Sequence, residues 1–244
     1  MGEGYHRSML RQPLKYSGFQ LSSAESNLLK SLASKYVWWK TAAEALATPQ
    51  RVLAQVMNIG DYTDVQALAN VVGDDALRGV LSSAEAGQFN ARSWTYWHCR
   101  LKLAELGCVP PLPSRRFGAK LTGDQVKTSL ASRMGEGTIG RPEVPDNGVV
   151  QDASLVRLMA AKLQAVQRGT EAQAYVEVSG LIERGVSLAQ GLAAARLLYG
   201  PNFQPSEVLK ALTYFEESDL RTLPAAVKAR LVAAAIAVRD LPGI

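Results

Sequence analysis

Apolar residues in the first half of the chain recur at the three- and four-residue spacing of helices with one buried face. Each run begins at a residue that favours a helix start, and most runs end at glycine. Pro49, for example, opens a run through Val52 and Val56 to Gly60, which fits proline in the first turn and glycine just past the end. Short turns separate the runs, so the pattern predicts a compact helical domain. The predicted helices span 22–39, 49–60, 61–73, 74–87 and 90–106.

The last third of the chain continues the helical spacing and opens with a predicted helical hairpin over 155–185. Arg168-Gly169-Thr170 interrupts the apolar spacing between the two helices of the hairpin. Thr170 suits the N-cap of the second helix, and Gly185 suits the position after its end. Three further helices are predicted over 187–200, 205–215 and 224–242.

Between the two helical regions, proline and glycine dominate. Pro110 to Arg116 is typical of a stiff, extended exit from the first region. A short helix is predicted over 125–134, and the glycine-rich stretch that follows predicts a linker or, alternatively, strands at 138–139 and 149–150. The sequence therefore predicts a mainly all-α protein of two helical domains joined by a Pro/Gly-rich linker. The predicted segments are an arm at 1–20, a helical domain at 21–117, a linker with a short helix at 118–150 and a helical domain at 151–244.

Composition agrees with a protein that buries a substantial core, since 47% of residues are hydrophobic and 20% are charged. No apolar run reaches the length of a membrane span, and the N-terminus lacks the apolar core of a signal peptide. Cys99 and Cys108 are the only cysteines, which favours a reducing, cytoplasmic setting.

The net charge is +5, and residues 1–119 carry +4 of it, from 13 Lys/Arg and 9 Asp/Glu. This modest excess predicts contacts with a protein or with nucleic acid in the first half. The candidate contact residues are Arg7, Arg11, Lys15, Arg92, Arg100, Arg115 and Arg116.

The segment from Arg92 to Leu103 is the richest in aromatic residues. Trp94 and Trp97 share one helical face, where they suit a recognition surface or a core closed over Trp38 and Trp39. The apolar neighbours favour the core. No metal site is predicted, because the two histidines are far apart and no Cys-x-x-Cys occurs. No phosphate-binding glycine motif occurs either, and we predict no cofactor.

The second half carries a family resemblance in 161–165, Arg168, 171–178, 185–188, 198–203 and 210–215. With the residues around them, over about 148–242, they resemble the helical C-terminal part of the AbiEii-type nucleotidyltransferase toxins. These toxins belong to bacterial toxin–antitoxin and phage-abortive systems. In the family, a Lys-Asp pair that includes a catalytic carboxylate stands where this chain has Gln173-Ala174. The resemblance therefore leaves Lys162 and Glu177 as vestigial active-site positions, without the carboxylates that nucleotidyl transfer needs to hold Mg²⁺.

The first half carries a second resemblance, in Val37-Trp38-Trp39, Arg51–Gly60, Asp64, Arg92–His98 and Pro110–Phe117. These motifs, over about 37–117, resemble a small bacterial protein encoded beside AbiEii-type toxins, which is regarded as their antitoxin. Together the resemblances imply a non-enzymatic toxin–antitoxin or phage-defence component that binds a bacterial protein, such as a toxin. The alternatives are an RNA- or DNA-binding subunit of a defence complex and, third, a nucleotidyltransferase with a degenerate active site.

Overall fold

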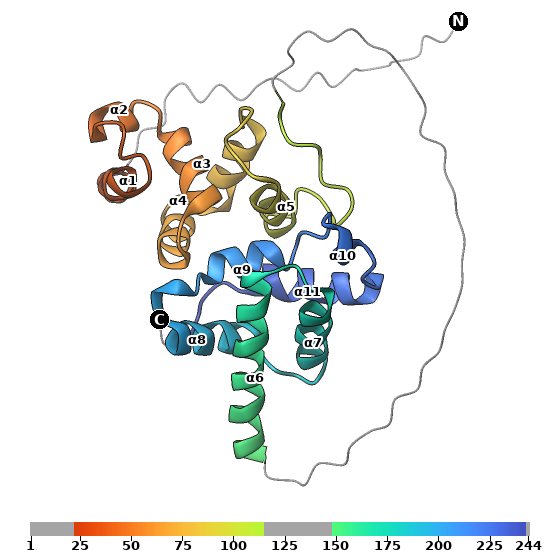
Figure 1. Cartoon of the computed structure of the whole chain (residues 1–244). Coiled ribbons are helices and arrows are strands. Elements are labelled where there is room, and N and C mark those ends of the chain that lie inside the picture. The colour runs from red at the N-terminus through yellow and green to blue at the C-terminus, as the bar shows by residue number, and fades with distance from the viewer. Residues whose placement is uncertain (1–21, 115–147, 243–244) are drawn as a thin grey trace, which may run out of the picture.

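The computed structural model describes residues 22–114 and 148–242, with side chains from residue 153 in the second range. Every regular element in these ranges is a helix, which confirms the predicted all-α class (Figure 1). The predicted arm at 1–20 and the predicted helix at 125–134 lie outside the described residues. The helices of the first range are α1 (Ser23–Tyr36), α2 (Ala42–Leu46), α3 (Pro49–Ile59), α4 (Tyr62–Ser82) and α5 (Ala91–Arg100).

Local capping explains where the first helices begin. Ser22 and Glu25 form a reciprocal capping box at the start of α1, where the predicted helix over 22–39 begins. Thr41 and Glu44 form a second capping box that starts α2, a short helix that the apolar spacing did not predict. Asp61 caps α4 by accepting a hydrogen bond from the Asp64 backbone amide.

The predicted break between the helices 61–73 and 74–87 is present: Gly73 has a non-helical φ of 76°, which glycine adopts without strain, and this kink divides α4. The ends predicted at 39, 87 and 106 were wrong, since α1 ends at Tyr36 and α4 ends at Ser82. The helix that begins after Asn90 ends at Arg100 rather than at 106. Lys102 then takes a left-handed φ of 57°, and the Leu103 amide donates back to the His98 carbonyl, which terminates the helix.

The second range forms a group of helices around α6 (Figure 1). Val149 and Val150 lie within α6, so the alternative of a strand there was wrong. Gly191 of α8 lies directly against α6, because a Cβ atom at this position would lie 2.3 Å from the Met159 side chain. The elements are α6 (Gly148–Arg168), α7 (Ala172–Glu183), α8 (Leu188–Tyr199), the 3₁₀ turn η1 (Gly200–Asn202), α9 (Pro205–Ala211), α10 (Ser218–Arg221) and α11 (Ala225–Ala237).

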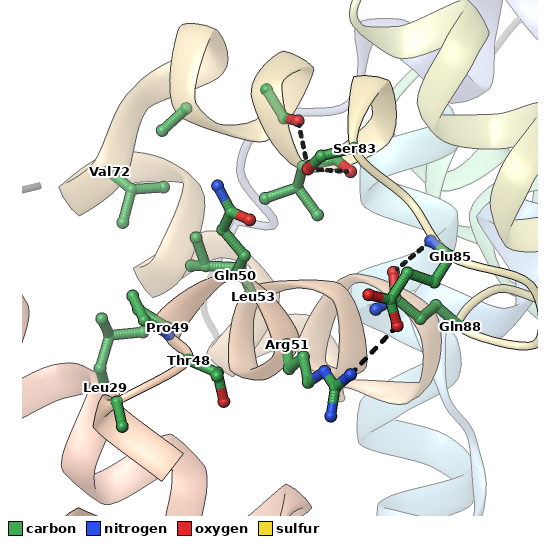
Figure 2. A pocket seen from close by; sticks show the side chains of 14 residues that line it. Leu29, Thr48, Pro49, Gln50, Arg51, Leu53, Val72, Ser83, Glu85 and Gln88 are labelled. Atoms are coloured by element: carbon green, nitrogen blue, oxygen red, sulfur yellow. Dashed lines mark hydrogen bonds and ion pairs between the residues drawn. The ribbon is translucent and has the colours of Figure 1, made fainter. Parts of the chain in front are cut away.

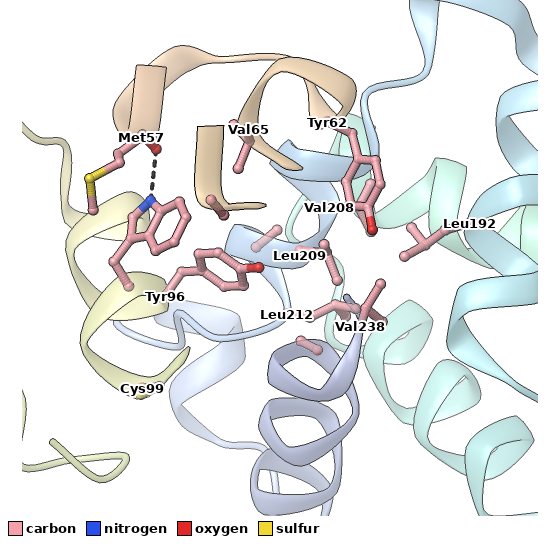
Figure 3. Packing of buried hydrophobic residues seen from close by; sticks show 14 of the residues in the cluster. Met57, Tyr62, Val65, Tyr96, Cys99, Leu192, Val208, Leu209, Leu212 and Val238 are labelled. Carbon is pink, nitrogen blue, oxygen red and sulfur yellow. Dashed lines mark hydrogen bonds between the residues drawn. The ribbon is translucent and has the colours of Figure 1, made fainter. Parts of the chain in front are cut away.

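The two groups of helices pack against each other and share one continuous hydrophobic core. Helix α5 contacts α9 and α11, and α4 contacts α9. Figure 3 shows this region, with Tyr62 and Tyr96 from the first group beside Leu209, Leu212 and Val238 from the second. Burial of apolar surface between the groups is therefore a major stabilising term for the whole described structure.

The C-terminal end of α3, whose last carbonyls have no partner inside the helix, receives polar contacts from α5 of the same group and from α9 of the second group. The Trp97 indole donates to the Met57 carbonyl at 2.8 Å. Ser93 and Lys210 both donate to the Asn58 carbonyl, and the Ser206 hydroxyl donates to the Gly60 carbonyl. Side chains from α5 and α9 thus complete the hydrogen bonding of this helix end.

Lys210 is the most unusual of these groups, because its side chain is 1% exposed. Its ammonium lies 2.7 Å from the Asn58 carbonyl and 2.8 Å from the Glu207 carboxylate. Burial lowers the pKa of the Lys210 ammonium, and the charge and hydrogen bond of Glu207 oppose that change. The contacts are structural: they join α9 to the end of α3.

Candidate functional site

Two adjacent tryptophans protrude from the surface in the turn between α1 and α2. Trp38 is 77% exposed and Trp39 is 56% exposed. Their ring centroids lie 5.8 Å apart and their planes are nearly perpendicular, so each ring supports the other. Buried Val37 and a hydrogen bond from the Lys40 amide to the Val37 carbonyl fix the turn. Large aromatic side chains at this exposure mark a candidate binding surface.

A hollow of about 450 Å³ lies beside Trp39. Val37, Ala45 and Val52 contribute apolar lining, while Lys40 and Arg51 contribute positive charge. The hollow is within the size range of sites that accept a few side chains of a partner or a small molecule.

A second hollow of about 410 Å³ adjoins the first and lies between α1, α3 and α4 (Figure 2). Leu29, Leu53 and Val72 are among the apolar residues that line it, and Gln50 and Ser83 add neutral polar groups. Both hollows share Thr48, Arg51, Glu85 and Gln88 as lining residues.

The Arg51–Glu85 ion pair stands where the two hollows meet, with 3.1 Å between the charged atoms (Figure 2). Both side chains are more than half exposed, so the pair contributes only about 0–1 kcal/mol to folding and can open without endangering the fold. We call Trp38, Trp39 and the two hollows together the Trp38 face. It combines aromatic anchors, apolar depressions and one movable charge pair.

The sequence-based hypothesis of a shared core of four tryptophans was wrong for Trp38 and Trp39. Trp94 and Trp97 are buried as predicted, with exposed fractions of 6% and 0%. Their indole N–H groups donate to the Pro110 and Met57 carbonyls. Trp38 and Trp39 lie beyond the end of α1, in the turn before α2, so no helical face directs them into the core.

The prediction of Arg100 as a contact residue was wrong, because this residue is only 3% exposed. Its guanidinium donates to the Tyr96 hydroxyl at 2.9 Å and to the Gln66 side chain at 3.5 Å. It also lies 5.1 Å from the Trp97 ring centroid, in a cation–π contact. Arg100 was predicted from its charge and from α5 alone, whereas Gln66 of α4 is one of its partners.

Arg92 is about one-third exposed and forms an ion pair with Glu217 at 2.5 Å, across the two groups of helices. It therefore has a partner within the chain. The other predicted contact residues, Arg7, Arg11, Lys15, Arg115 and Arg116, lie outside the described residues.

Lys162 and Glu177, predicted as vestigial active-site positions, are brought together by α6 and α7. Their charged atoms lie 2.6 Å apart, and both side chains are about one-third exposed. Gln173 donates a further hydrogen bond to Glu177, and the contact with Lys162 lowers the pKa of the Glu177 carboxyl. Ala174, which lies between Lys162 and Glu177 in the sequence, is buried and has no group that binds a cation.

Within the described ranges, no three His, Cys, Asp or Glu side chains gather as a metal site would require. In the same part of the chain, no helix is both long and apolar enough to cross a membrane. Cys99 is buried and Cys108 is exposed, and both are free thiols.

Comparison of the chain with family models, with curated proteins and with solved structures gave no match.

Proposed function

We propose that this chain works by binding a protein partner through the Trp38 face. The observation that carries the proposal is the exposure of Trp38 and Trp39, at 77% and 56%, with one hollow beside Trp39 and a second hollow that adjoins the first. Tryptophan and arginine are the commonest energetic anchors of protein interfaces. Burying an aromatic side chain in a partner removes a large apolar area from water. In the free chain, Trp38 and Trp39 keep that area exposed.

The charges of the Trp38 face favour a protein over nucleic acid. Arg51 is accompanied by Glu85, and a carboxylate between the hollows would repel a phosphate backbone. A protein surface, which carries both signs of charge, can complement the pair.

The biological setting of the proposal is a bacterial toxin–antitoxin or phage-defence system in the cytoplasm. Its support is the sequence resemblance of the two halves to an antitoxin-like protein and to the helical part of AbiEii-type toxins. A non-enzymatic role is part of the proposal, because Ala174 replaces a catalytic carboxylate of that family. The ion pair of Lys162 with Glu177 occupies the remaining charged positions.

A second candidate function is nucleic-acid binding. It is favoured by one observation: Lys40 and Arg51 line the hollow beside the exposed ring of Trp39. Bases stack on aromatic rings while nearby cations attract the backbone.

The test isolates the tagged chain from its source cells and identifies the macromolecules that accompany it. The variant is Trp38→Ala/Trp39→Ala, and the matched control is Leu197→Ala, an apolar side chain that is 74% exposed on α8. We expect one protein to accompany the wild type and the control, and to be lost from the double variant. With the purified partner, the double variant should bind more than about thirtyfold more weakly, since a hot-spot tryptophan contributes at least about 2 kcal/mol.

Circular dichroism should show the same helical content in all three proteins. Retention of the partner by the double variant would refute the role of the Trp38 face. Bound RNA or DNA that dissociates steeply as salt rises would instead support the second candidate.

A further inference from the structure

A third hollow, of about 470 Å³, lies between the two groups of helices and away from the Trp38 face. Trp94 and the segment Pro110–Leu112 line it from the first group, and Tyr214 and Phe215 line it from the second. Its volume is within the range of small-molecule sites, which form preferentially where two parts of a protein meet.

The apolar wall of this hollow is held in place from both sides. The Trp94 indole donates to the Pro110 carbonyl at 2.8 Å, which fixes the extended proline segment against α5. Phe215 is 6% exposed and packs edge-on against Tyr175, a fully buried residue of α7. A wall of this kind, made of proline and aromatic side chains, favours a flat apolar ligand over a polar one.

Positive charge lines one side of the hollow. Among its lining residues, Arg221 and Lys228 are cationic and Glu216 is the only carboxylate. Arg221 and Glu216 pair loosely, at 3.5 Å, and both are about two-thirds exposed. No ion pair involves Lys228 within the described residues. Its ammonium instead donates to the Arg221 carbonyl at 2.8 Å and lies 5.7 Å from the Phe215 ring centroid.

The position of Lys228 matters because its two contacts leave N–H groups available. An ammonium has three donors, and one hydrogen bond to a carbonyl uses one of them. An anionic group bound beside the Phe215 ring would supply a negative charge to pair with the Lys228 ammonium. A charge-assisted hydrogen bond next to an apolar wall is stronger than the same bond in open water.

We propose that this hollow binds a small anionic ligand with a flat apolar body, such as an aromatic carboxylate or sulfonate, with Lys228 contacting the anionic group. The apolar body lies against Phe215 and Pro110–Leu112. Because both groups of helices line the site, the ligand also holds them together, so its binding stabilises the folded chain. This site is independent of the proposed function and of the Trp38 face.

The test uses two fluorescent probes of nearly the same shape, 8-anilinonaphthalene-1-sulfonate and its uncharged analogue N-phenyl-1-naphthylamine. We expect the sulfonate to bind the full chain at one saturable site and more tightly than the neutral probe. Lys228→Met should weaken sulfonate binding about tenfold, the effect of one lost charge-assisted hydrogen bond, and leave binding of the neutral probe unchanged. Lys30→Met, on α1 and away from this hollow, is the matched control and should change neither probe.

A second variant tests the location of the site without removing charge. Thr95→Phe places a ring in the hollow from α5 and should abolish the binding of both probes while Lys228 stays in place. The proposal is overturned if Lys228→Met weakens the binding of both probes equally, or if its effect on sulfonate binding is no larger than that of Lys30→Met. It is also overturned if Thr95→Phe leaves probe binding intact.

Discussion

Replacing Trp97 by alanine removes a buried side chain that joins α5 to the end of α3. Trp97 is completely buried. Its indole donates to the Met57 carbonyl at the end of α3, and its ring lies 5.1 Å from the Arg100 guanidinium. The substitution therefore opens a cavity, leaves a helix-end carbonyl without its donor and takes an aromatic face from a buried cation.

The expected loss of unfolding free energy follows from these three changes. Truncating a buried tryptophan costs about 3–5 kcal/mol through lost burial and the cavity that remains. Loss of the hydrogen bond to Met57 and of the cation–π contact with Arg100 places Trp97→Ala at the upper end of that range. Since whole proteins are stable by only about 5–15 kcal/mol, the variant should be close to unfolding. For a chain of this size we expect the melting temperature to fall by roughly 6–20 °C.

The assay is urea unfolding followed by circular dichroism, with Trp38→Ala as the control. Both variants lose the same side chain, but Trp38 is 77% exposed, so its loss should change the unfolding free energy by no more than about 0.5 kcal/mol. The reasoning is refuted if Trp97→Ala costs less than about 1 kcal/mol, or if the two variants are equally destabilised.

Three further outcomes are expected. Gly191→Ala should destabilise the chain by about 1–3 kcal/mol in the same assay, because the new Cβ would lie 2.3 Å from the Met159 side chain. Gly180→Ala is the control and should not destabilise the chain, because no atom lies within 4 Å of the new Cβ there. Burial lowers the pKa of the His98 imidazole, and its contact with the Trp94 carbonyl opposes this change. The unfolded chain therefore takes up a proton more readily, so the free energy of unfolding should fall as pH drops through about 6.5. His98→Gln should flatten that pH dependence. With labelled nucleoside triphosphates, Mg²⁺ and tRNA, we expect no label transfer; transfer that disappears in Lys162→Ala would contradict the non-enzymatic proposal.

The sequence predicted the local features of this fold better than the tertiary ones. The starts of α1, α3 and α8 were correct because residues such as Ser22, Pro49 and Ser187 determine them through contacts within a few positions. The capping box of Thr41 and Glu44 was equally visible, but α2 is too short to show an apolar period.

The candidate site depended on information that the sequence holds only weakly. Gln66, one of the partners of the buried Arg100, is 34 positions away, so no pattern within α5 indicates this contact. Both hollows of the Trp38 face combine residues of α3 with Glu85 and Gln88, which follow α4, and with residues of other elements. The pairing of Lys162 with Glu177, in contrast, follows from the predicted helical hairpin, since both lie on its two adjacent helices.

The capping of α3 also sets an order of events on the ribosome. Ser93 and Trp97 follow their carbonyl partners by 35 and 40 residues, whereas Lys210 follows Asn58 by 152. At about 5–20 residues per second, the lysine is synthesised roughly 8–30 s after its acceptor. During that interval the nascent first group keeps the apolar side of α5 uncovered, within reach of chaperones and proteases. Arrival of α9 supplies the last donors to α3 and begins to cover α5, and α11 then adds its own contacts with α5.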